Sequence, residues 1–110
     1  MYTLIFTLAE RRFGLDSHHV SFISEALPLT SLPMVPNYID GVINVEGDVL
    51  AQINLAILFK LEASQKSGQL IIIKFDDVRI AIRVDKVEER VLCEDTNVVS
   101  DVENNNNNKL

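Results

Sequence analysis

The stretch GVINVEGDVLAQIN, residues 41–54, decides how the rest of the chain is interpreted. Two runs of β-branched and aliphatic residues, at 42–45 and 49–53, flank a short connection made of Glu46, Gly47 and Asp48. A short connection with a central glycine is typical of a tight β-hairpin, because glycine adopts positive φ without a Cβ clash. The stretch therefore predicts an antiparallel hairpin with its turn at residues 46–48.

A second hairpin is predicted downstream. Residues 69–75 form an apolar run, and residues 78–84 alternate apolar side chains with Arg79, Ala81 and Arg83. Asp76 and Asp77 lie between the two runs, and aspartates make turns by accepting hydrogen bonds from nearby backbone N–H groups. Residues 87–92 predict one further short strand.

The segments before and after the first hairpin predict a strand and two short helical turns. Residues 2–8 alternate in a way that indicates a strand covered on both faces, followed by a polar turn at 10–12. Ser17 is a capping residue for a helical turn with Val20, Ile23 and Leu27 on one face. Helical spacing returns at 55–61, where we expect three side chains to be core: Leu55, Leu58 and Phe59. These patterns predict an all-β fold with one or two short helices.

The composition indicates one compact domain and excludes some classes of partner. Of 110 residues, 47% are hydrophobic, which is ample for a core in a chain of this size. Sixteen acidic against ten basic residues give a net charge of −6, and Arg11–Arg12 is the largest cluster of bases. Because phosphate-backbone binders gather Lys and Arg on one face, the composition argues against nucleic acid as a partner.

The sequence also predicts a cytoplasmic location. No apolar run approaches the about 18 residues that a membrane-spanning helix needs, so we expect no direct membrane insertion. The basic pair at 11–12 follows the N-terminal apolar run, which reverses the order of a signal peptide. Cys93 is the single cysteine and has no intrachain partner, which favours a reducing compartment.

The chain divides into a domain at 1–93 and a tail at 94–110. The tail carries a cluster of acids, Glu94, Asp95, Asp101 and Glu103, and the asparagine run 104–108. Such a composition buries little apolar surface, so we expect this segment to be flexible. It is a natural segment, a linker or a cloning remnant; the sequence leaves these alternatives open.

Residues able to carry catalysis or bind metals form no established pattern. His18 and His19 have no further His or Cys ligand beside them in the sequence. The acids Asp76, Asp77, Asp85, Glu88 and Glu89 lack the alternating ligands and central glycine of a calcium loop. Cys93 has no neighbouring histidine and is expected to be an inert, partly buried thiol. We therefore expect no metal, no cofactor and no enzymatic activity.

Four groups of residues follow one another along the chain with characteristic spacing: Phe6, Leu8, Phe13, Gly14 and Leu15; Leu32, Pro33 and Pro36; Gly41, Val42, Ile43, Asn44, Gly47, Val49, Ile53, Asn54 and Leu55; and Ala81, Ile82, Val84, Asp85 and Val87. With this order and spacing, residues 4–92 resemble the CheW-like domain, the adaptor family of bacterial chemotaxis. The glycines, prolines and asparagine at fixed positions make the resemblance specific.

The resemblance implies a fold and a function. The fold is a pair of small SH3-type β-barrels, and the function is that of a cytoplasmic, non-catalytic adaptor. Such an adaptor couples the cytoplasmic tip of a chemoreceptor to the regulatory domain of a CheA-type histidine kinase. Family members continue with further strands and a helix where this chain enters its Asn-rich end. We therefore expect an incomplete second barrel with an open strand edge.

The resemblance also locates a candidate partner surface. We expect partner contacts at the first hairpin and at the segment after Ser17, through Asn44, Glu46, Gly47, Asp48, Val20, Phe22 and Ile23, because interfaces combine apolar anchors with a polar rim. Glu46 stands where the family usually has Arg, and Phe22 where it has an acid. The reversed charge predicts weakened receptor contact.

Two other interpretations stay open. The residue types at 44–48 are also those that satisfy a tight turn without any partner. The alternative function is a self-associating structural module, in which the open barrel edge pairs with another chain to form a homo-oligomer.

Overall fold

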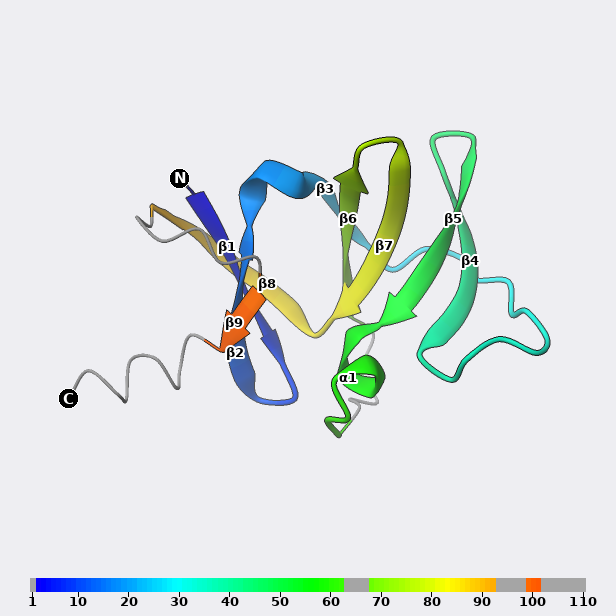
Figure 1. Cartoon of the computed structure of the whole chain (residues 1–110), viewed down its shortest axis with the longest axis horizontal. Helices are drawn as coiled ribbons and strands as arrows, with labels where there is room; N and C mark the ends of the chain where they lie inside the picture. The colour runs from blue at the N-terminus through cyan, green and yellow to red at the C-terminus, as the bar shows by residue number, and fades with distance from the viewer. Residues whose placement is uncertain (1, 63–67, 93–98, 102–110) are drawn as a thin grey trace.

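The computed structural model describes residues 2–62, 68–92 and 99–101, and this part of the chain is built mainly of strands (Figure 1). In chain order the elements are β1 (Tyr2–Leu8), β2 (Arg11–Asp16), the 3-10 turn η1 (Ser17–His19), β3 (Val20–Glu25), β4 (Ile39–Val45), β5 (Asp48–Asn54), α1 (Leu55–Leu58), β6 (Gln69–Phe75), β7 (Val78–Val84), β8 (Lys86–Leu92) and β9 (Val99–Asp101). The prediction of an all-β fold with short helices is confirmed.

The strands form two sheets. The larger sheet has the order β3-β6-β7-β5-β4, and the smaller one has the order β8-β1-β2-β9. Neighbouring strands are antiparallel except for β5 and β7, which are parallel. Beyond β3, the Thr30 N–H donates to the Val42 carbonyl over 2.9 Å, and the Val42 N–H donates back over 2.8 Å. This bridge brings the chain that follows β3 against the outer edge of β4.

Two apolar clusters form the core. The first joins both sheets and α1 through Leu4, Phe6, Leu8, Phe13, Leu15, Leu55, Ala56, Ile71, Ile73, Ile82 and Val84. The second lies on the other face of the larger sheet and contains Ile43, Val45, Leu50, Leu70, Ile72 and Ala81. Successive residues of β6 therefore point alternately into the two clusters. Strand β6 thus contributes buried side chains to both clusters.

The two predicted hairpins are both present. The turn between β4 and β5 has two residues, Glu46 and Gly47, with φ of 53° and 87°, because Asp48 already pairs with Val45. Positive φ at both turn positions matches the right-handed twist of the flanking strands, as in a type I′ turn. The turn between β6 and β7 has no glycine, and Asp76 adopts φ of 53° there. Aspartate tolerates this region better than most side chains because it bonds locally to the backbone.

The predicted helical turn with Val20, Ile23 and Leu27 on one face is wrong. The helical part is confined to the 3-10 turn Ser17–His19, and Asp16, not Ser17, caps it: Asp16 Oδ1 accepts a hydrogen bond from the His18 N–H over 2.9 Å. Val20 already begins strand β3, which pairs with β6. Residues 20–25 have helical spacing, but they form a strand because pairing with the apolar β6 is more favourable. The β-branched Val20 and Ile23 also suit the pleated surface of a sheet.

The apolar residues at 55–61 are only partly core. Asn54 Oδ1 accepts a hydrogen bond from the Ile57 N–H over 3.3 Å and starts α1, and Leu55 is buried. Leu58 and Phe59, expected in the core, are 41% and 37% exposed, so that expectation is wrong for both. The helix ends after a single turn, and Phe59 contacts the first cluster through Phe13, with ring centroids 5.8 Å apart.

The N-terminal strand is confirmed, with Leu4, Ile5 and Phe6 buried on alternating faces. The polar turn is shorter than predicted, because Arg11 already pairs with Leu8 and the turn comprises Ala9 and Glu10 alone. Residues 87–92 form a strand as predicted, as part of β8.

Some expectations lie outside the described residues. They concern Cys93, the middle of the loop at 63–67, and most of the tail at 94–110. Within that tail, Val99–Asp101 forms β9 and pairs with β2.

The described residues contain no helix that is long and apolar enough to cross a membrane.

Candidate partner-binding surface

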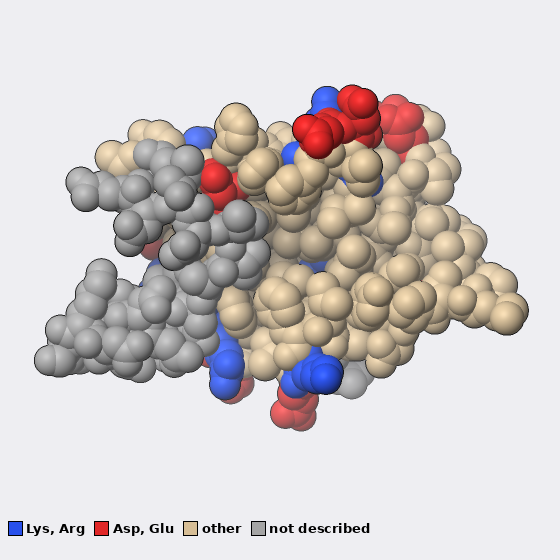
Figure 2. Space-filling view, viewed as in Figure 1, with Lys and Arg blue, Asp and Glu red and all other residues tan. Residues whose placement is uncertain are grey.

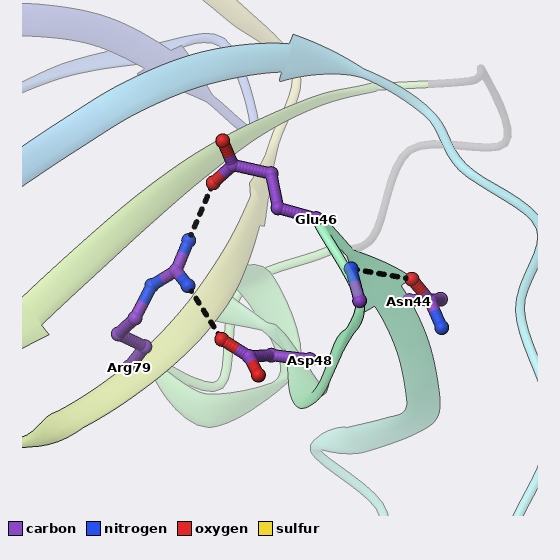
Figure 3. A network of polar contacts seen from close by, with 5 residues as sticks. Asn44, Glu46, Asp48 and Arg79 are labelled. Carbon is purple, nitrogen blue, oxygen red and sulfur yellow. Dashed lines mark hydrogen bonds and ion pairs between the residues drawn. The ribbon is translucent and has the colours of Figure 1, made fainter.

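The β4–β5 turn is held in place by its own side chain. Asn44 Oδ1 accepts a hydrogen bond from the Gly47 N–H over 3.1 Å (Figure 3). The bond satisfies a backbone donor that the turn would otherwise leave to solvent. Glu46 is the first residue of the turn and Asp48 the first of β5, and both side chains are exposed. The turn therefore presents its two carboxylates at one end of the larger sheet.

Arg79 joins these two carboxylates. Its Nη2 lies 3.1 Å from Glu46 Oε1, and its Nη1 lies 3.0 Å from Asp48 Oδ2 (Figure 3). The guanidinium is planar and offers several donors in fixed directions, so it can bind both carboxylates at once. Because both acids are well exposed, each pair is worth at most about 1 kcal/mol. The contribution of the network is mainly to orient the hairpin end.

Sequence reasoning missed Arg79 as part of this surface. Gln52 pairs with Ala81 in the parallel β5–β7 ladder, and Arg79 lies two residues before Ala81, on the same face of β7, where it contacts Asp48 at the start of β5. Its side chain therefore emerges on the face of the second cluster, at the same end as Asp48. The alternation of residues 78–84 predicted that the side chains of Arg79 and Ala81 point to the same face of the strand. The pairing of β7 with β5 could not be inferred, because it is a non-local contact.

The other predicted residues lie on β3. Phe22 packs against the second cluster and Val20 against the first, whereas Ile23 is exposed. In the order of the larger sheet, β3 and the β4–β5 hairpin are at opposite ends. The structure thus brings Asn44, Glu46, Gly47 and Asp48 together and places the β3 residues on another strand, with two of the three side chains partly buried. Their role in binding stays a prediction.

The two histidines take part in ring contacts. The ring centroids of His18 and His19 are 5.2 Å apart, and His19 stacks on Phe75 with centroids 4.2 Å apart. Among the residues that the structure describes, no group of three or more His, Cys, Asp or Glu side chains is arranged to hold a metal ion. The arrangement at the β4–β5 hairpin can make polar and apolar contacts with another macromolecule.

Comparison with known families identifies the chain. A model of the CheW-like domain matches residues 3–109. The chain belongs to the CheW-like domain family. The match confirms the resemblance inferred from the spaced glycines, prolines and asparagine.

Curated relatives and a solved structure extend this assignment of the CheW-like domain. The chain is 27% identical over 85 residues to a chemotaxis protein CheW of Thermotoga maritima, covering 76% of this chain and 56% of the relative. It is 27% identical over 101 residues to a chemotaxis protein CheW of Treponema pallidum, covering 86% of this chain and 59% of the relative. The crystal structure of the scaffolding protein TtCheW from Thermoanaerobacter tengcongensis superimposes with a TM-score of 0.77 at 29% identity, covering 82% of this chain and 63% of that one.

The CheW-like chain is shorter than these relatives. It spans between 56% and 65% of the length of the curated CheW proteins that it matches, the longest match being to Helicobacter pylori. The shared fold and family therefore apply to the part of the relatives that this chain covers.

Proposed function

We propose that this CheW-like domain is a non-catalytic adaptor of bacterial chemotaxis signalling that acts through protein–protein contacts in the cytoplasm. The observation that carries the proposal is the family match over residues 3–109, supported by relatives named as chemotaxis proteins. The structural neighbour named a scaffolding protein gives further support.

The proposed partners are the regulatory domain of a CheA-type histidine kinase and the cytoplasmic tip of a chemoreceptor. The proposed contacts are made by the β4–β5 hairpin with Asn44, Glu46, Gly47 and Asp48, and separately by β3 with the exposed Ile23 and the partly buried Val20 and Phe22. An oriented polar hairpin supports this role, because an interface that is already ordered loses less conformational entropy on binding.

A pull-down with purified proteins tests the adaptor role. The chain is immobilised and offered a CheA-type regulatory domain and a receptor tip separately, with a circular-dichroism spectrum as the check on folding. We expect both partners to be retained. A folded sample that retains neither partner would falsify the adaptor role for this chain.

Glu46→Arg tests the proposed receptor contact. An arginine at this position adds a cation toward an acidic partner, so we expect tighter binding of the receptor tip and unchanged binding of the kinase domain. The same change places a cation beside Arg79. The matched control is therefore Glu46→Gln, which removes the charge without adding repulsion. Unchanged receptor affinity in Glu46→Arg contradicts a role for this side chain.

A further inference from the structure

Exposed apolar side chains lie where the two hairpins of the larger sheet end. Val49, Phe75 and Val78 are 69%, 42% and 63% exposed. Phe75 and Val78 are direct partners in the β6–β7 ladder. The β5–β7 ladder begins at Gln52 and Ala81, and ahead of it the Asp48–Arg79 contact brings the start of β5, with Val49, to the start of β7, with Val78. We name Val49, Phe75 and Val78 the tip patch.

The tip patch continues a face that is buried elsewhere. Phe75 follows Ile71 and Ile73 in the alternation of β6, and those two side chains are buried in the first cluster. Phe75 and Val78 are exposed, so this face is open to solvent at the hairpin end. His19 stacks on the ring of Phe75 and so orients it, but Phe75 still exposes much of its surface. A single exposed apolar residue is ordinary, whereas adjacent ones on a rigid face are typical of an interaction surface.

The surroundings of the tip patch are acidic. The β6–β7 turn carries two exposed acids beside it, Asp76 and Asp77, whereas the carboxylates of Glu46 and Asp48 are engaged by Arg79. The nearby bases Lys74 and Arg79 pair with each other in the β6–β7 ladder, so they lie on the opposite face of that hairpin from Phe75 and Val78. Arg79 is in addition bound by the two carboxylates of the other turn. Figure 2 shows acidic side chains, with a few basic ones among them, along the upper edge of the molecule.

From this combination we infer that the tip patch docks a protein segment whose apolar side chains are flanked by Lys or Arg. The apolar part of the segment covers Val49, Phe75 and Val78, and its cations meet the carboxylates of Asp76 and Asp77 in the β6–β7 turn. Complementary charge at the rim accelerates association and selects against acidic segments, while the apolar contact supplies most of the affinity. The inference rests on the proposed adaptor function, since it specifies the chemistry of one partner.

Two labelled peptides test the chemistry directly. One is a short leucine-rich peptide flanked by lysines, and the other has glutamates in place of the lysines; binding to the full chain is followed by fluorescence anisotropy. We expect the lysine-flanked peptide to bind and the glutamate-flanked peptide not to bind. Raising the salt to about 1 M shortens the screening length to about 3 Å and should weaken the binding several-fold. Equal binding of both peptides, or binding of neither, overturns the inference.

Variants locate the binding on the surface. Val49→Ser combined with Val78→Ser removes exposed apolar contact and should weaken the lysine-flanked peptide by about tenfold, the loss expected for a central contact. Asp76→Asn combined with Asp77→Asn should weaken it only at low salt. Met34→Ser is the matched control, because Met34 is fully exposed and lies outside the tip patch. Unchanged binding in the valine variant, with a preserved melting transition, overturns the inference.

The outcomes also separate this inference from the adaptor role. If the valine variant loses a kinase or receptor partner that Met34→Ser retains, the tip patch is the docking surface for that partner. If the valine variant retains both partners and the peptides fail to discriminate, the tip patch inference fails and the adaptor role stands. If the wild-type chain retains neither partner but discriminates the peptides as expected, the adaptor role fails and the tip patch stands.

Discussion

Strands β6 and β8 are equally long, at seven residues each, but they differ in the burial of their side chains and in their position within the sheet. In β6 the run LIII is buried on both faces between β3 and β7, whereas β8 is an edge strand of the smaller sheet and has almost every side chain exposed. A strand that serves two cores is apolar at every position, and an edge strand carries charges that discourage pairing with other chains. The stability of the fold should therefore depend strongly on β6 and weakly on β8.

The largest expected effect is in β6. Ile71 and Ile72 are both fully buried but point into different clusters. We expect Ile71→Ala and Ile72→Ala each to lower the free energy of unfolding by about 2–5 kcal/mol, through lost burial and a residual cavity. Val91→Ala in β8 should change it by no more than about 0.5 kcal/mol. Urea denaturation measures all three, and a large loss at only one of the two isoleucines would contradict a strand shared by two cores.

The same contrast is expected within α1. Leu55 is buried in the first cluster, whereas Leu58 is 41% exposed. Leu55→Ala should cost about 2–5 kcal/mol, and Leu58→Ala less than about 1 kcal/mol. Thermal unfolding of the two variants checks this difference. An unchanged melting transition in Leu55→Ala would show that the helix does not contribute to the core.

A smaller effect is expected where the larger sheet meets the chain after β3. Gly41 has φ of 149°, and a Cβ there would collide with the Thr30 carbonyl oxygen. Gly41→Ala should break the Thr30–Val42 bridge and cost about 1–3 kcal/mol. Gly47 also has positive φ but faces open space, so Gly47→Ala should cost about 1 kcal/mol. Equal losses in urea denaturation would mean that backbone strain alone, and not the close approach to Thr30, controls both positions.

The smallest effects are expected for the cross-strand ion pairs of the two sheets. Arg79 lies within 3.1 Å of its carboxylate partners, whereas Arg12 lies 3.6 Å and 3.8 Å from Glu89 and Glu88 of β8. Arg79→Gln should cost at most about 1 kcal/mol, and Arg12→Gln less, because exposed pairs are screened by water. Melting temperatures at low and high salt test this order. A larger loss for Arg12→Gln would mean that β8 is held more firmly than its exposure indicates.

Local patterns predicted most of the strands correctly. The glycine at position 47 and the aspartates at 76–77 marked both hairpin turns, because turn chemistry depends on the few residues within the turn. The spaced glycines, prolines and asparagine were sufficient to identify the family. Prediction failed at Val20–Glu25 and at Leu58 and Phe59, where a helical period was present but pairing with β6 or the short length of α1 determined the outcome.

The candidate site shows the same division. Asn44, Glu46, Gly47 and Asp48 could be predicted as one surface because they belong to a single turn. Arg79 could not be added to them, since it is 31 residues away from Asp48 in the chain and reaches it only through the parallel β5–β7 pair. The tip patch was also hidden, because Val49, Phe75 and Val78 have the residue types of ordinary buried strand positions.

The sequence by itself determined the strand-rich class, the two hairpins, the acidic character and the CheW-like family of this chain. These properties depend on local backbone preference, residue type and spacing. The tertiary structure alone decided which face of β6 enters which cluster, that Arg79 orients the β4–β5 turn, and that an apolar face emerges uncovered between the two hairpin ends. The physical reason is that these features arise from pairing between distant strands, which the local preferences of either strand do not specify.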